Sequence, residues 1–129
     1  MIDILVIGIG GFIGSVSRYL LSIKVQQLFS GTMFPFGTMF VNISGCLIIG
    51  FISGFSENVV LLSPRIRFFL IAGVLGGYTT FSTFGNETFN LIREDEFILA
   101  LINVGIQVIM GVIAVWLGYV LSKICSSIV

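Results

Sequence analysis

The chain has 129 residues, of which 57% are hydrophobic and only 9% are charged, whereas soluble domains carry about 25% charged residues. This composition predicts an integral membrane protein with the lipid bilayer as its surroundings. Six basic and six acidic residues give a formal net charge of zero, which offers no electrostatic basis for nucleic-acid binding. There is no histidine, the commonest general base, so we do not expect an enzyme.

Charged residues divide the chain into four apolar blocks, which in chain order are residues 4–23, 36–55, 68–91 and 97–121. Each block is long enough to cross the hydrocarbon core, since roughly 20 helical residues suffice. The connections at 24–35, 56–67 and 92–96 are short. The sequence therefore predicts an all-α fold of four transmembrane helices forming a single domain over residues 1–129.

The first block carries small residues and one charge on a single helical face. Gly10, Gly14 and Arg18 follow one another at steps of four. Small residues let two helix backbones approach closely, and such a face would turn Arg18 toward the protein interior. The alternative is that Arg18 lies near the helix end and reaches the headgroups.

The second and fourth blocks also carry polar residues on one side. Thr38, Asn42 and Gly45 share a face of the second, and Asn103 and Gln107 share a face of the fourth. A carboxamide presents both donors and an acceptor, so these residues suit either hydrogen bonds between helices or a wet path through the bundle.

The third block is interrupted at residues 76–84 by the sequence GGYTTFSTF. We expect the helix to unwind at Gly76-Gly77 and the threonines after them, in the middle of the membrane. Non-helical chain at that depth survives only inside protein or beside water. Freed carbonyls suit a small cation, whereas the N-terminus of the next half-helix favours an anion. Phe81 and Phe84 fall on one face of that half-helix, where phenylalanine is ordinarily lipid-facing or core, although its positive ring edge also suits an anion.

The basic residues give almost no bias in orientation. With an even number of spans, both termini share a side with the 56–67 connection, and that side carries Arg65, Arg67 and Lys123. The other side carries Lys24 and Arg93, with Arg18 embedded near it. Because orientation follows the Lys/Arg bias of short loops, two interpretations remain open. Either the orientation is weakly set, or molecules insert both ways and pair as an antiparallel homodimer.

Three motifs together resemble the Fluc (CrcB) fluoride channel family: GFIGSVSRY in the first helix, GTMFVNISG in the second and GGYTTFSTF in the third. The likeness extends over all four spans. It implies a dual-topology homodimer in a prokaryotic plasma (inner) membrane, with two pores that pass fluoride passively out of the cell. It also implies a structural Na⁺ at the dimer centre, bound by the backbone carbonyls of Gly76 and Thr79.

The resemblance makes Phe81 and Phe84 the pore phenylalanines and Asn42 the pore asparagine. It places Arg18 near the vestibule and Glu87 toward a pore end. The amides of the fourth helix depart from the hydroxyl-rich pattern of that family. Together with the polar positions of the spans, the expected anion pathway comprises Arg18, Thr38, Asn42, Phe81, Ser82, Thr83, Phe84, Glu87, Asn103 and Gln107.

Two other functions fit a chain of this size. A small dual-topology multidrug exporter would need a buried carboxylate in the first helix, where this chain has Arg18. A non-transporting accessory subunit would use its polar residues to bond partner helices, but gives no reason for a break in the third span.

Overall fold

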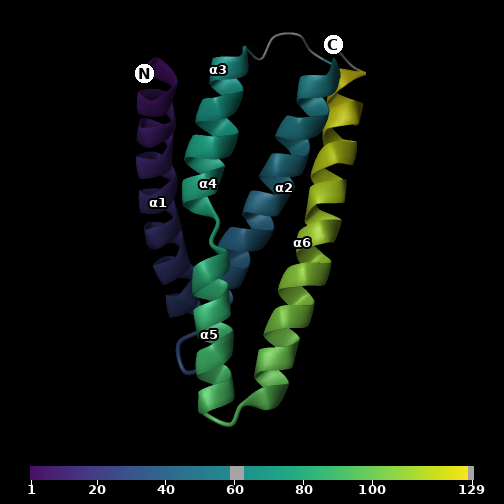
Figure 1. Ribbon diagram of the computed structural model, residues 1–129. Coiled ribbons are helices and arrows are strands. Elements are labelled where there is room, and N and C mark those ends of the chain that lie inside the picture. The colour runs from purple at the N-terminus through teal and green to yellow at the C-terminus, as the bar shows by residue number, and fades with distance from the viewer. Residues whose placement is uncertain (59–62, 128–129) are drawn as a thin grey trace.

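The computed structural model describes residues 1–58 and 63–127, without the side chains of 56–58, and every regular element in them is helical. Four helical spans in this part of the chain are long and apolar enough to cross a membrane. The first two are α1 (Ile2–Leu28) and α2 (Phe36–Asn58), and the last is α6 (Phe97–Ser126). Both termini lie at the same end of the bundle, as an even number of spans requires (Figure 1).

The third span is built from four consecutive segments. They are α3 (Pro64–Arg67), the π-helical segment η1 (Phe68–Leu75), α4 (Gly76–Tyr78) and α5 (Phe81–Arg93). The predicted mid-span break is confirmed, and Figure 1 shows it as the extended link between α4 and α5. The unwinding predicted at the threonines is confirmed, since Thr79 and Thr80 leave the helix, whereas the unwinding predicted at Gly76 and Gly77 was wrong, because both are helical.

The helices extend beyond the predicted spans. α1 continues through Lys24 to Leu28, α6 continues to Ser126, and the third span covers Pro64–Arg93 instead of 68–91. The predicted limits followed the apolar blocks, but a charged side chain near the interface does not interrupt backbone hydrogen bonding. Hydropathy therefore located the membrane core of each helix and not its ends. Part of the predicted 56–67 connection, residues 59–62, lies outside the described residues.

The bundle is held by two close helix pairs, α1 against η1 and α4, and α2 against α6. In the first pair, a Cβ on the buried Gly14 would meet the backbone carbonyl of Val74 and the amide of Tyr78. In the second, a Cβ on Gly118 would meet the carbonyl of Leu47. The small face predicted in the first helix is thus a close-packing face, as expected for helix pairs in a bilayer.

Gly77 has the same packing role, since a Cβ there would be 2.5 Å from the carbonyl oxygen of Gly11 in α1. Gly77 therefore lets α4 approach α1. Val41, Leu75 and Tyr78 form the small buried core beside it, and the Tyr78 hydroxyl lies 2.8 Å from Ser44 Oγ. Many large apolar side chains elsewhere are exposed on the isolated chain, as expected for surfaces that face lipid or another subunit.

Candidate functional site

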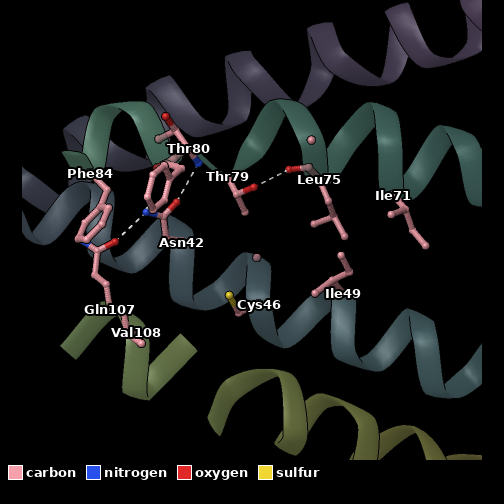
Figure 2. A pocket seen from close by; sticks show the side chains of 13 residues that line it. Asn42, Cys46, Ile49, Ile71, Leu75, Thr79, Thr80, Phe84, Gln107 and Val108 are labelled. Atoms are coloured by element: carbon pink, nitrogen blue, oxygen red, sulfur yellow. Dashed lines mark hydrogen bonds between the residues drawn. The ribbon is translucent and has the colours of Figure 1, made fainter. Parts of the chain in front are cut away.

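The break in the third span is held by Asn42 of α2. Thr79 (φ −84°, ψ 159°) and Thr80 (φ −152°, ψ 115°) are extended. The Thr80 amide donates to Asn42 Oδ1 at 2.9 Å, and Asn42 Nδ2 donates to the Thr80 carbonyl at 3.2 Å. One side chain thus satisfies both backbone groups of Thr80, which the helix no longer pairs. Figure 2 shows the bond between the Thr80 amide and Asn42, at the end of the pocket where Phe84 and Gln107 lie.

A chain of amides continues from Asn42 across to α6. Asn42 Nδ2 donates to Gln107 Oε1 at 2.7 Å, and Gln107 Nε2 donates to Asn103 Oδ1 at 2.8 Å. Asn103, which is completely buried, donates through Nδ2 to Thr88 Oγ1 at 2.8 Å, and that hydroxyl donates to the Phe84 carbonyl at 2.7 Å. We name Asn42, Gln107, Asn103 and Thr88 the amide chain. It connects α2, α5 and α6.

The start of α5 is capped by Thr80. Its hydroxyl oxygen accepts from the Thr83 amide at 3.2 Å and donates to Thr83 Oγ1 at 2.9 Å. The hydroxyls of Thr80 and Ser82 are 3.3 Å apart. The hydroxyl-rich sequence therefore stops one half-helix and begins the next, as Ser and Thr do at helix N-caps. The exposed side chains of Ser82 and Thr83 lie at the N-terminus of α5, where the helix dipole favours negative charge.

Phe81 and Phe84 lie beside the amide chain, with ring centroids 5.5 Å apart. Both line a cavity of about 380 Å³, together with Asn42, Thr80 and Gln107. Phe84 lies against these residues in Figure 2. Phe81 is 83% exposed on the isolated chain, so its ring faces out of the monomer. The cavity is therefore polar along the amide chain and aromatic on its α5 side.

Arg18, Thr38 and Glu87 extend the polar groups beyond this cavity. Arg18 Nη1 donates to the Thr79 carbonyl at 3.4 Å, so the arginine points to the break, and the alternative of reaching only the headgroups is wrong for this structure. Thr38 Oγ1 donates to Glu87 Oε1 at 2.7 Å. Glu87 Oε2 is buried without a hydrogen-bond partner in the described part of the chain.

Residues of α5 and its N-cap line two cavities. Thr80 and Phe84 line the first, whereas Thr83 and Glu87 line a second of about 410 Å³, bordered also by Thr38. Of the ten residues predicted for the anion pathway, nine lie on α2, α5 and α6, and Arg18 reaches the break from α1. Their roles toward an ion stay predictions.

The carbonyls predicted to bind a cation lie at the end of α4. In a continued helix, the Thr80 amide would bond to the Gly76 carbonyl, but it donates to Asn42 instead. Gly76 is exposed and lines the first cavity together with Thr79. Two carbonyl oxygens released at a helix C-terminus are a fitting donor set for a hard cation. The Thr79 oxygen also accepts from the Arg18 guanidinium, whose positive charge works against a cation at that oxygen.

Two residues of the site were not predicted from the sequence. Thr88 ends the amide chain and Thr80 caps α5. Thr88 lies four residues after Phe84 on the same helical face, and that spacing was the available signal. The sequence indicated Thr80 only as part of the unwound segment. Its role as a cap depends on its backbone angles, which the sequence does not give.

A broken helix at membrane depth, beside a buried polar strip in a four-span bundle, defines a small polytopic membrane transport protein. Residues 5–119 match the family model for CrcB-like protein, Camphor Resistance (CrcB). The chain belongs to the CrcB family.

Curated relatives match nearly the whole chain. A protein of Geotalea uraniireducens is 45% identical over 123 residues, which cover 95% of this chain and 98% of that protein. A protein of Chlorobaculum tepidum is 44% identical over 124 residues, covering 96% and 97%. One of Flavobacterium psychrophilum is 40% identical over 123 residues, covering 95% and 98%. Each of the three is named as a fluoride-specific ion channel, FluC.

Proposed function

We propose that this protein is a fluoride-specific channel that passes F⁻ passively across a membrane. The observation that carries the proposal is the identity of 40–45% to fluoride-specific channels over almost the full length of both partners. The three motifs of the first three helices lie within the matched region. A channel of this kind releases fluoride down its electrochemical gradient and forms no covalent intermediate.

The residues of the site have the chemistry that a fluoride pathway needs. Fluoride is small and strongly hydrated, so a pore has to replace its water with hydrogen-bond donors, each weak enough to release it. Hydroxyls at the N-terminus of α5, the amides of α2 and α6, and the ring edges of Phe81 and Phe84 supply such groups in sequence. Two charged residues border these groups: Arg18 at the break and Glu87 beside Thr38.

We propose further that two copies pair antiparallel and form two pores. The balanced loop charges favour insertion in both orientations. Phe81 is exposed on the isolated chain although it borders the cavity, and a second copy would cover it. The assembly would be isologous, with its twofold axis in the membrane plane.

A structural Na⁺ fits this dimer. The carbonyls of Gly76 and Thr79 are the groups that would hold it, and a second copy would double that oxygen set. When bound, the ion would neutralise the negative ends of these carbonyl dipoles. The Arg18 guanidinium opposes a cation at the Thr79 oxygen, so binding there would require the hydrogen bond from Arg18 to weaken.

The protein is a multi-pass membrane protein, and its named relatives come from bacteria. We place it in the prokaryotic inner membrane. There it would export fluoride that enters the cell as hydrogen fluoride and ionises in the cytoplasm.

The deciding experiment is fluoride efflux from liposomes that contain only the purified protein and Na⁺. We expect rapid efflux of fluoride and no comparable efflux of chloride. Dimeric protein that passes no fluoride would refute the channel. Proton-driven uptake of a cationic drug would instead indicate the multidrug exporter. Transport of neither fluoride nor the drug would favour the interpretation as a non-transporting accessory subunit.

A further inference from the structure

The amide hydrogens of Asn42 are already engaged. A carboxamide nitrogen has two hydrogens. Asn42 Nδ2 directs one to Gln107 Oε1 at 2.7 Å and the other to the Thr80 carbonyl at 3.2 Å. Gln107 Oε1 therefore occupies the acceptor position beside Asn42 that an anion in the cavity would take. For Asn42 to donate to an anion, the Gln107 oxygen has to leave.

Gln107 can exchange this acceptor for a donor without changing its packing, because the oxygen and nitrogen of a carboxamide are nearly equal in size. Turning its amide over brings Nε2 toward Asn42 Nδ2. The two donors then face each other, and only an acceptor placed between them satisfies both. Both side chains line the cavity, so such an acceptor can enter from there (Figure 2).

The turn has to extend along the amide chain. A turned Gln107 presents its oxygen to Asn103 Oδ1, so Asn103 has to turn as well. Asn103 is completely buried, and a mismatched pair there has no water to relieve it. A turned Asn103 presents its oxygen to Thr88 Oγ1, which now donates to the Phe84 carbonyl. A hydroxyl can rotate and donate to Asn103 instead.

The amide chain thus has two self-consistent arrangements. In the observed arrangement, Asn42 donates to Gln107, Gln107 donates to Asn103, and Asn103 donates to Thr88. Asn42 then has no amide hydrogen left for an anion. In the reversed one, Gln107 and Asn42 both offer hydrogens to a common point in the cavity. The Thr88 hydroxyl ends the chain and can either accept from Asn103 or donate to it, so both arrangements are satisfied there.

We propose that Gln107 is a specificity-determining residue whose amide turns to bind the anion together with Asn42. The inference rests on the proposed fluoride function and adds to it a residue and a means of selection. Gln107 has to withdraw as it turns, because an ion between two N–H groups holds the nitrogens further apart than the 2.7 Å that now joins Asn42 Nδ2 to Gln107 Oε1. Fluoride is a small, strong acceptor, so it needs the least withdrawal of the halides. Chloride is larger and a weaker acceptor, so its hydrogen bonds do not offset the free-energy cost of reversing the amide chain.

The first test compares fluoride flux in liposomes for the wild type, Gln107→Met and the control Gln27→Met. Methionine keeps the length of the side chain without its donor or acceptor, and Gln27 is exposed on α1. We expect Gln107→Met to lose about tenfold in flux, the effect of one lost hydrogen bond to a charged group. Gln27→Met should conduct as the wild type does. Unchanged flux in Gln107→Met would overturn the inference.

The reversal itself is tested by coupling to Thr88. Thr88→Val should reduce flux more than Thr88→Ser, which keeps the hydroxyl. In the Gln107→Met background, Thr88→Val should cause no further loss, because the chain is already cut. Fully additive losses would show that each side chain acts separately, and would overturn the inference.

A second measurement does not depend on ion flux through any variant. The glutamines of this chain are Gln26, Gln27 and Gln107, so the side-chain ¹⁵N signal of Gln107 is assigned by its loss in Gln107→Met. In wild-type protein it should shift on addition of NaF and stay in place with NaCl at the same ionic strength. No shift with NaF in conducting protein would overturn the inference alone. No fluoride flux through the wild type would remove the proposed function and this inference with it.

Discussion

Replacing Asn42 by leucine should loosen the break of the third span. Leucine has a similar volume but makes none of the three hydrogen bonds that Asn42 makes: with the Thr80 amide, the Thr80 carbonyl and Gln107 Oε1. The change therefore separates the polar function of the side chain from its packing. Thr80 is only 8% exposed, so water reaches its freed backbone groups poorly.

The expected loss follows from these bonds. Side-chain hydrogen bonds in membrane proteins are worth about 0.6 kcal/mol each on average, so three give about 2 kcal/mol. A buried amide left without a partner adds a cost of about 1–3 kcal/mol. We expect Asn42→Leu to lower the free energy of unfolding by about 3–5 kcal/mol.

The assay is reversible unfolding at fixed protein and lipid concentrations, because dimer dissociation would otherwise contribute to the measured free energy. Asn86→Leu is the matched control, since Asn86 is exposed on α5. Hydrogen exchange gives an independent measurement, in which the Thr80 amide should lose its protection in Asn42→Leu only. If Asn42→Leu were as stable as Asn86→Leu and the Thr80 amide stayed protected, Asn42 would not hold the break.

Three further predictions test the pathway, the assembly and the packing. Phe81→Ile should cut fluoride flux strongly with an intact dimer, because it removes an aromatic ring edge at the border of the cavity. Size-exclusion chromatography beside the flux assay checks this, and unchanged flux would eliminate ring-edge solvation. Two lysines added to the 24–35 connection should force one orientation and impair antiparallel assembly, measured by cross-linking and flux; retained function would contradict the antiparallel dimer. Gly118→Ala should destabilise by about 1–3 kcal/mol through collision with the Leu47 carbonyl, whereas Gly105→Ala, which meets nothing within 4 Å, should be neutral or stabilising. Equal unfolding free energies for the two alanine variants would show that α2 and α6 can separate at no cost.

The spans and their polar faces were predictable because both depend on short-range patterns. Arg18 lies on the face of α1 defined by Gly10 and Gly14, and Asn103 and Gln107 meet as neighbours one turn apart. Such relations follow from the helical repeat once a segment is known to be helical. The break was also predictable, since glycines and hydroxyl residues are poor material for the middle of a lipid-facing helix.

The sequence predicted a break over the glycines and the threonines after them, and its exact limits were not predictable from these residues. Gly76 and Gly77 are the residues most tolerant of unwinding, and yet they remain helical. Gly77 packs against Gly11, whereas Asn42, distant in sequence, supplies the partners that let Thr80 leave the helix. A helix opens where its backbone groups find other partners, and those partners come from another span.

The sequence by itself determined that this is a four-span membrane protein with a polar, interrupted third helix, because apolar length and helical spacing are local properties. Its motifs also identified the family. Only the tertiary structure decided that Asn42 satisfies the break and that its amide hydrogens are taken by Gln107 and Thr80. Hydrogen bonds between spans depend on distance and direction in space, and no pattern along one helix specifies them.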